Sequence, residues 1–277
     1  MREPTRPRLL VVVAGTGTEV GKTWVTFEAA ARLRRDRSLD VAARKPAQSF
    51  DPDDDSTDAD LLASATRSRP FDVCPEHRWY PAPMAPPMAA DMLGRDAIEL
   101  AALASEVAAS WPGRAPDIGF VELAGGVRSP MAHDGDGVDL TRALRPDLVV
   151  LVADAGLGTI NSVRLSLAAI ATAGAPRTIV ALNRYDDSVA LHRDNRRWLI
   201  AHDGFEVVVS VGELVGVLHD ALPRWCAGCG KRAAECDGTC LPPLDPPRHC
   251  PICGRKVVVT IIPTGTTTRC KTHGVID

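Results

Sequence analysis

The segment Gly15-Thr-Gly-Thr-Glu-Val-Gly-Lys-Thr23 constrains the fold more than any other feature of this sequence. It follows the aliphatic run at residues 9–14 and leads directly into an amphipathic helical pattern. In such a glycine-rich turn, backbone N–H groups and the positive end of the helix dipole bind phosphate oxygens. Strict spacing would put a glycine at Thr16, whereas the glycine present is one residue earlier. We predict a phosphate-binding loop here rather than a solvated glycine turn.

This loop also predicts how a nucleotide would be held. The Lys22 ammonium can reach the β and γ phosphates, and the Thr23 hydroxyl can bind magnesium. The predicted nucleotide-binding residues of the loop are Gly17, Thr18, Glu19, Val20, Gly21, Lys22 and Thr23.

Apolar runs and helical patterns alternate over the first 225 residues. The runs lie at residues 9–14, 41–45, 118–122, 148–154, 178–183 and 206–210, and most are continuously aliphatic, as strands buried on both faces are. Helical patterns lie at residues 23–35, 59–66, 96–109, 160–173, 189–201 and 213–222. The alternation predicts an α/β fold of the P-loop NTPase type, a mostly parallel sheet with helices on both faces.

Two long loops interrupt this rhythm. Residues 70–87 contain six prolines and the pair Trp79 and Tyr80, and residues 124–139 are rich in Gly and Asp. Because loops that follow the strands of such a sheet usually build the binding site, we expect both near the nucleotide.

Two carboxylates are candidates for the magnesium that a P-loop nucleotide requires. Glu122 ends an apolar strand, where it would otherwise be an unpaired buried charge. Asp58 begins a helix just beyond the second strand, and its alternative role is that of an ordinary first-turn acid. Together with Thr23, Asp58 and Glu122 form the predicted magnesium site.

Several motifs, taken in order, resemble the dethiobiotin synthetase family. They are the phosphate-binding loop, Arg44-Lys-Pro46, Thr57-Asp-Ala59, the Pro-rich Tyr80-Pro-Ala-Pro-Met-Ala-Pro-Pro87, Glu122-Leu-Ala-Gly-Gly126 and Gly156-Leu-Gly-Thr-Ile-Asn161. The resemblance covers residues 9 to about 222. It implies an ATP- and magnesium-dependent ligase that closes a cyclic urea on 7,8-diaminononanoate with carbon dioxide, through a carbamate and a carbamic–phosphoric anhydride.

The resemblance also implies roles for individual residues. Lys22, Lys45 and Thr18 would be catalytic, with Lys45 contacting the carbamate and the γ-phosphate. Asn183 would hydrogen-bond the adenine. The diamine would be bound by Ser49, Thr18, Gly125, Gly126, Gly158, Thr159 and Asn161, of which Gly158, Thr159 and Asn161 would act from the partner subunit of a homodimer.

Departures from the family pattern leave alternatives open. Gly17 stands where an acidic residue is usual, Leu123 replaces a glycine, and Ser210-Val-Gly replaces a Pro-containing adenine loop. We read Gly17 and Leu123 as changes at the substrate pocket. The alternative function is a P-loop ATPase that acts on another amine or serves as a partner-regulated switch. A partitioning ATPase is disfavoured because the early lysine of its loop is absent.

Seven of the eight cysteines fall within the last 52 residues, and we therefore place a domain boundary after residue 225. Residues 226–277 form a predicted zinc-ribbon-like module with two sites. One site is Cys226, Cys229, Cys236 and Cys240, and the other is Cys250, Cys253, Cys270 and His273, with a strand at residues 257–263. Disulfides and iron–sulfur ligation are the alternatives.

Charge and hydropathy restrict the partners. The tail's formal charge of +3 is cancelled when four thiolates bind one Zn²⁺ and three bind the other, and no Phe, Tyr or Trp follows Trp225 to stack on bases. We therefore expect no nucleic acid, and a structural or protein-docking role for the tail. The apolar runs are far shorter than the about 20 residues that a membrane helix requires. With no signal-peptide pattern either, the sequence predicts a cytoplasmic protein.

Overall fold

The computed structural model describes residues 6–37, 39–111, 113–174, 177–242, 245–262 and 265–276. Contacts within the chain divide it into two compact units, Met1–Asp220 and Ala221–Asp277. Trp225, which the sequence placed before the boundary, lies in the second unit. That each unit is an independent domain stays a prediction.

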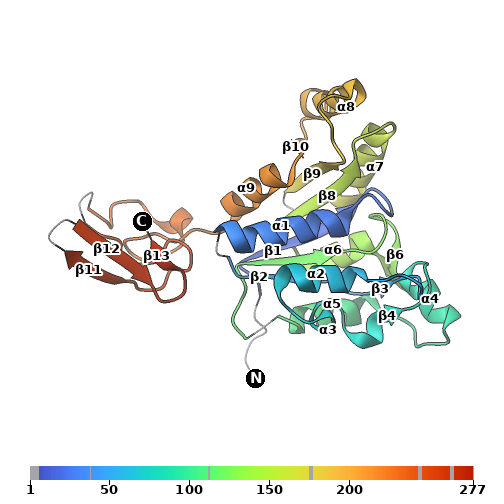
Figure 1. Ribbon diagram of the computed structural model, residues 1–277, viewed down its shortest axis with the longest axis horizontal. Coiled ribbons are helices and arrows are strands. Elements are labelled where there is room, and N and C mark those ends of the chain that lie inside the picture. The colour runs from blue at the N-terminus through green and yellow to red at the C-terminus, as the bar shows by residue number, and fades with distance from the viewer. Residues whose placement is uncertain are drawn as a thin grey trace. The chain divides into compact units, whose positions relative to one another are not determined.

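The first unit alternates strands and helices as expected (Figure 1). Its strands are β1 (Leu9–Gly15), β2 (Val41–Arg44), β3 (Gln48–Ser49), β4 (Trp79–Tyr80), β5 (Ile118–Glu122), β6 (Pro130–Ala132), β7 (Gly135–Asp136), β8 (Leu148–Asp154), β9 (Thr178–Asn183) and β10 (Glu206–Val208). Its helices are α1 (Lys22–Arg37), α2 (Asp58–Thr66), α3 (Pro70–Val73), η1 (Glu76–Arg78), α4 (Pro86–Met92), α5 (Leu100–Ala109), α6 (Gly137–Leu144), α7 (Thr159–Ala171), α8 (Ala190–Ala201) and α9 (Val211–Ala221).

A six-stranded sheet in the order β10-β9-β8-β1-β5-β2 forms the centre of this unit. Every strand pair in it is parallel, and β1 lies between β5 and β8. The six strands are those predicted from the apolar runs. All seven residues of β1 are buried, because helices cover both faces of a continuously aliphatic strand. The predicted α/β fold is therefore confirmed.

The helices pack in two groups. One group comprises α1, α2 and α3, in which α1 also contacts β1, β2 and β5. The other comprises α5, α6, α7 and α8, in which α7 packs on β8. Parallel strands connected in this way bring all their carboxyl ends to one edge of the sheet, which is where ligands bind in such folds.

The helix predicted at residues 96–109 begins four residues later, at Leu100. Residues 96–99 lie outside any helix or strand, and hydrogen bonds from Ile98 and Leu100 tie this segment to the turn between β6 and β7. The Ile98 N–H donates to His133 Nδ1 at 2.9 Å, the Ile98 carbonyl accepts from the His133 N–H at 2.9 Å, and the Leu100 N–H donates to Asp134 Oδ1 at 2.7 Å. These tertiary hydrogen bonds outweigh the local helical preference.

Both long loops contain short elements. Residues 70–87 form α3, η1, β4 and the start of α4, and residues 124–139 form β6, β7 and the start of α6. Within the described ranges, no helix is both long enough and apolar enough to cross a membrane.

The second unit is built on an antiparallel sheet. It comprises η2 (Ala233–Glu235), β11 (Val258–Ile262), β12 (Gly265–Cys270) and β13 (Gly274–Ile276), with β12 in the middle. The predicted strand at residues 257–263 corresponds to β11, and Pro263 lies outside the described residues.

Candidate functional site

The phosphate-binding loop joins β1 to α1, and its backbone requires glycine. Gly21 has φ +90°, and a Cβ placed there would lie 2.1 Å from Asn183 Nδ2. Lys22, the first residue of α1, is nearly buried and donates from Nζ to the Gly17 carbonyl at 3.0 Å. The lysine thus bends back over the loop, where phosphate oxygens would replace that carbonyl as its partner.

The predicted magnesium ligands meet at one point. Thr23 Oγ1 lies 2.8 Å from Asp58 Oδ1 and 2.8 Å from Glu122 Oε1. Asp58 is held there because Thr57 caps α2 in a capping box with Asp60. Glu122 emerges from the end of β5, next to β1 in the sheet. A hydroxyl and two carboxylates in this arrangement are the ligands that Mg²⁺ prefers.

Lys45, which follows β2, neutralises this pair of carboxylates. Its ammonium lies 2.8 Å from Glu122 Oε1 and also forms an ion pair with Asp58. Glu122 is completely buried, and its Oε2 atom has no hydrogen-bond partner in the described part of the chain. An unpartnered buried carboxylate oxygen is costly, so this atom fits a cation bound beside Thr23.

Burial and charge act in opposite directions on the ionisable groups of the site. Burial lowers the pKa of Lys45, but the charges of Glu122 and Asp58 outweigh it and hold that pKa above its usual value. For Asp58 burial raises the pKa, and the ion pair with Lys45 overcomes this and lowers it. Burial lowers the pKa of Lys22. Lys45 is therefore a cation and Asp58 an anion at neutral pH.

A cavity of about 460 Å³ opens beside these groups. It is lined by Thr18, Glu19, Gly21, Lys22, Thr23, Lys45, Ser49, Asp58, Pro83, Met84, Ala85, Pro86, Ala124, Gly125 and Ser129. The predicted residues Thr18, Ser49 and Gly125 thus share one cavity with Lys22, Lys45 and Asp58, whereas Glu122 does not line it. The Ser49 hydroxyl is buried and has no hydrogen-bond partner among the described residues.

Sequence reasoning missed Ser129 in this cavity and misplaced Leu123. Ser129 Oγ accepts a hydrogen bond from the Gly126 N–H at 2.9 Å, and a Cβ on Gly125 (φ +65°) would lie 2.4 Å from it. Leu123 is 1% exposed and belongs to the hydrophobic core, because side chains alternate in direction after Glu122. It does not line the cavity, so the expectation that Leu123 alters the substrate pocket is wrong.

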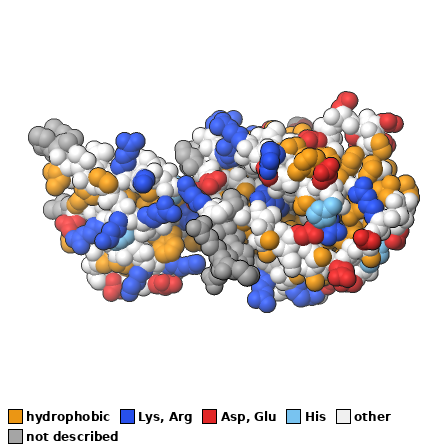
Figure 2. All heavy atoms as spheres, turned by 90° about the horizontal axis from the view of Figure 1, so that it is seen from below, with side chains coloured by type: hydrophobic (Ala, Val, Ile, Leu, Met, Phe, Trp, Pro, Cys, Tyr) orange, Lys and Arg blue, Asp and Glu red, His pale blue; other side chains and the backbone are white. Residues whose placement is uncertain are grey.

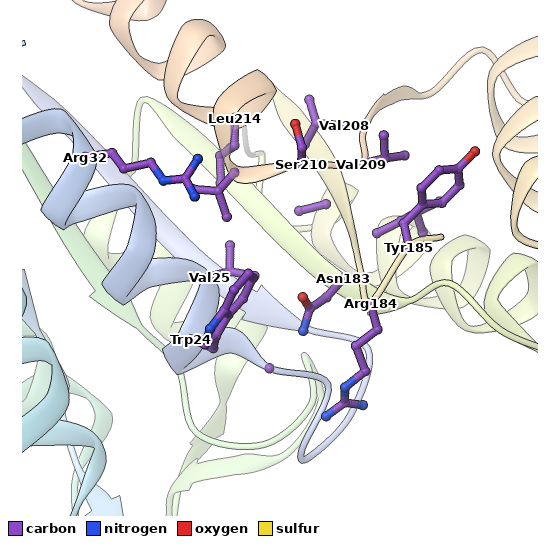
Figure 3. A pocket seen from close by; sticks show the side chains of 14 residues that line it. Trp24, Val25, Arg32, Asn183, Arg184, Tyr185, Val208, Val209, Ser210 and Leu214 are labelled. Carbon is purple, nitrogen blue, oxygen red and sulfur yellow. The ribbon is translucent and has the colours of Figure 1, made fainter. Parts of the chain in front are cut away.

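A second cavity, of about 680 Å³, lies on the other side of the loop. Asn183 and Trp24 approach it from the end of β9 and the first turn of α1, and Arg184, Tyr185 and Ser210 also line it (Figure 3). The Asn183 side chain donates to the Val20 carbonyl at 3.0 Å, which ties β9 to the loop. Trp24 was missed, although its position directly after Thr23 could have indicated it.

The residues at the start of α7 line neither of these two cavities. Gly158 has φ +91° as the N-cap, and the Thr159 hydroxyl is buried without a hydrogen-bond partner in the described residues. Leu157, just before it, is 93% exposed. Gly158, Thr159 and Asn161 are thus not brought together with Lys45 and Ser49 within one chain.

In the second unit the predicted ligand sets are both assembled. The ligand atoms of Cys226, Cys229, Cys236 and Cys240 lie within 4.8 Å of one another, as do those of Cys250, Cys253, Cys270 and His273. In the first set the Cys226 and Cys240 sulfurs are 3.1 Å apart, and those of Cys229 and Cys236 are 3.8 Å apart. Tetrahedral Zn–S bonds of about 2.3 Å put sulfurs about 3.8 Å apart. Each of the eight cysteines, all of them within the described residues, is free of disulfide bonds in this structure.

The fold and the loop define a P-loop nucleotide-binding protein. A family model described as an AAA domain matches residues 10–217. The ATP-dependent dethiobiotin synthetase of Rhodococcus jostii is 38% identical over 73% of this chain and 85% of its own length. That of Haloferax mediterranei is 34% identical over 77% of this chain and 88% of its own length. The chain belongs to the dethiobiotin synthetase family, a family of ATP-dependent ligases.

Likeness to solved structures is weaker. A plasmid partition protein from Borrelia burgdorferi is 12% identical, with a TM-score of 0.47 over 79% of this chain and 97% of that one. This value carries no argument about function. The family match ends at residue 217, before the cysteine clusters begin.

Proposed function

We propose that this chain closes a cyclic urea on 7,8-diaminononanoate with carbon dioxide, at the expense of ATP. The observation that carries the proposal is one cavity lined by Lys22, Lys45, Thr23, Asp58 and Ser49, whose hydroxyl has no hydrogen-bond partner among the described residues. Glu122 lies directly behind it, 2.8 Å from both Thr23 Oγ1 and Lys45 Nζ. Membership of the dethiobiotin synthetase family supports it.

ATP would bind with its phosphates on the phosphate-binding loop and its base in the cavity on the other side of that loop. Its phosphates would lie on the backbone of residues 17–22 and against the Lys22 ammonium, at the N-terminus of α1. Its base would enter the 680 Å³ cavity, within reach of Asn183. Thr23, Asp58 and Glu122 would hold Mg²⁺, which when bound neutralises charge on the β and γ phosphates.

The protein's own part in the chemistry is positioning and charge neutralisation. One amine of the substrate adds to carbon dioxide and loses a proton to give a carbamate. A carbamate oxygen attacks the γ-phosphorus as ADP leaves, and the second amine then attacks the carbamate carbon and displaces phosphate. Lys45 and Lys22 line the cavity together with Thr18 and would neutralise the negative charge that develops on the transferring phosphoryl group.

The diamine would be bound from two directions. Ser49 and Gly125 line the cavity beside Lys45, and Gly126 packs against the phosphate-binding loop. The carboxylate end would be met by the start of α7 from the partner subunit of a homodimer, because a helix N-terminus attracts anions. The unpartnered Thr159 hydroxyl and the exposed Leu157 support this arrangement.

The C-terminal unit would bind two structural Zn²⁺ ions, one in each ligand set. Thiolate ligands require a reducing compartment, which agrees with the proposed cytoplasmic location. On the face shown in Figure 2, the basic side chains of this unit are mixed with acidic and hydrophobic ones rather than forming a stripe. This supports a structural or protein-docking role over nucleic-acid binding.

The test is ATP hydrolysis by the full chain with magnesium and bicarbonate, in the presence and absence of 7,8-diaminononanoate, with the product identified by mass. The proposal predicts ADP and dethiobiotin only when the diamine is present. Hydrolysis that is stimulated by another amine would move the function to that substrate. An ATP hydrolysis rate that is the same with and without amines would favour a partner-regulated ATPase.

A further inference from the structure

Two segments of the C-terminal unit repeat one pattern at an offset of 24 residues. Knuckle A (residues 225–232) and knuckle B (residues 249–256) each contain Cys-x-x-Cys-Gly followed by two basic residues. Both have the same backbone. The first cysteine N–H donates to the carbonyl five residues on, at 2.7 Å in A and 2.8 Å in B. The glycine N–H donates back to the first cysteine's carbonyl, at 2.9 and 2.8 Å.

The two knuckles bind each other through equivalent atoms. The Trp225 N–H of knuckle A donates to the Pro251 carbonyl of B at 2.8 Å, and the His249 N–H of B donates to the Ala227 carbonyl of A at 2.8 Å. Trp225 and Ala227 correspond to His249 and Pro251 under the 24-residue offset. The knuckles are therefore related by a local two-fold pseudosymmetry.

The side chains of Trp225 and His249 also pack reciprocally, each against the other knuckle. The indole of Trp225 covers Gly254 of knuckle B, where an added Cβ would lie 2.7 Å from the ring. The imidazole of His249 covers Gly230 of knuckle A, where an added Cβ would lie 2.6 Å from the ring. His249 Nδ1 also lies 2.9 Å from the Gly228 carbonyl. Each metal-binding turn is thus held in shape by the residue that begins the other one.

The ligand sets nevertheless remain separate. Knuckle A completes its set with Cys236 and Cys240 and forms site A, whereas knuckle B uses Cys270 and His273, at β12 and the turn after it, and forms site B. The shared interface joins two turns that belong to two different ions.

We propose that the C-terminal unit takes up its two metal ions as a coupled pair, with Trp225 and His249 as positioning residues that transmit the coupling. The inference rests on the zinc sites of the proposed function. The unit's buried apolar cluster is small, comprising Cys250, Cys270 and Ile276 with Ile252, Cys253 and Val257 packed against it, so the turns depend on the ions and on the contacts between the knuckles. When one ion is absent its knuckle loses the geometry that the other knuckle packs against.

Cobalt titration of the full chain, stripped of metal, tests this proposal. Co²⁺ bound by four sulfurs and Co²⁺ bound by three sulfurs and a nitrogen differ in their absorption spectra, so the two sites are followed separately. Cys270→Ser removes a site B ligand that lies outside both knuckles. We expect the Co²⁺ affinity of site A to fall at least about tenfold, as when a residue that supports a metal ligand is lost. Unchanged affinity at site A overturns the coupling.

A matched pair of glycine variants tests the route of the coupling. Gly254 and Gly274 each follow a site B ligand and have φ of +69° and +74°, but only Gly254 is covered by Trp225. Gly254→Ala should weaken site A at least about tenfold more than Gly274→Ala does. Equal effects would show that Trp225 does not transmit the coupling.

Measurement of the metal content distinguishes failure of the coupling from failure of the proposed zinc sites. Two ions per wild-type chain that bind independently overturn the coupling alone. Fewer than two ions per wild-type chain overturn both the zinc sites and the coupling.

Discussion

The two units of this chain are stabilised by different means. In the first unit Val11, Val12, Val149 and Val150 of the central strands are completely buried, and Val12 and Val149 belong to a large hydrophobic core cluster. In the second, the buried apolar cluster is formed largely by cysteines that are themselves the predicted metal ligands. A core of this first kind forms without a ligand, whereas a unit of 57 residues with so small a core depends on metal. We therefore expect that removal of metal from the second unit leaves nucleotide binding unchanged, and that substitutions at the nucleotide site leave the metal content unchanged.

Removal of metal should produce the largest effect. A strong chelator should unfold the second unit, because structural zinc contributes about 10 kcal/mol or more of folding free energy. Nucleotide affinity should not change. Amide hydrogen exchange of residues 226–277 and an ATP-binding titration measure the two responses on one sample. Loss of ATP binding together with the tail structure would contradict the separation of the units.

Replacement of Lys45 should affect only the first unit. Lys45→Ala removes the cation that faces Glu122 and Asp58, and we expect turnover to fall roughly 100- to 1,000-fold while ATP binding stays nearly intact. Steady-state rates and nucleotide titration together provide the measurement. Lys271→Ala, an exposed lysine of the second unit, is the control and should retain full turnover. A fully active Lys45→Ala protein would exclude the proposed role of this lysine.

Gly21→Ala should weaken nucleotide binding. The new Cβ would collide with the Asn183 amide at a backbone φ of +90°, and strain of this kind costs about 1–3 kcal/mol. Calorimetric titration with ADP measures the loss. Gly94→Ala provides the matched control, because Gly94 also has positive φ but has open space around it. Equal ADP affinity in the two variants would mean that Asn183 does not constrain the loop.

Ser49→Ala should have the smallest effect of the four. It removes the hydroxyl that lines the cavity without a partner, so the KM for the diamine should rise by the equivalent of one hydrogen bond, about 1 kcal/mol. The KM for ATP should remain constant. Ser56→Ala, at an exposed serine before α2, should change neither value. A rise in the KM for ATP alone would place Ser49 on the nucleotide side.

The fold of the first unit could be predicted from the sequence because its continuous aliphatic runs are typical of buried parallel strands. Its glycine-rich loop lies between such a run and a helical pattern, which is typical of a phosphate-binding loop. Glu122 could be singled out because a carboxylate at the end of a buried strand needs a partner, and the structure places it beside Thr23 and Lys45; its role as a magnesium ligand stays a prediction. The predictions were wrong where contacts between residues far apart in the sequence determine the local structure. The helix begins at Leu100 rather than at residue 96 because Ile98 and Leu100 bind His133 and Asp134, and Leu123 turns into the core.

In the second unit the sequence predicted which residues would be ligands, and the structure assembled the same two sets. It could not predict the interface between the knuckles. That interface combines backbone hydrogen bonds from Trp225 and His249 with the packing of their rings on Gly254 and Gly230. A backbone N–H is present in every residue except proline, so the sequence does not show which ones pair across the interface.

We propose above that the first unit forms a cyclic urea from a diamine and carbon dioxide. Reaction of the full chain with ATP, 7,8-diaminononanoate and ¹³C-labelled bicarbonate tests it most directly. The account predicts one ADP per dethiobiotin formed, with the label in the urea carbon. ADP release without labelled product would contradict it.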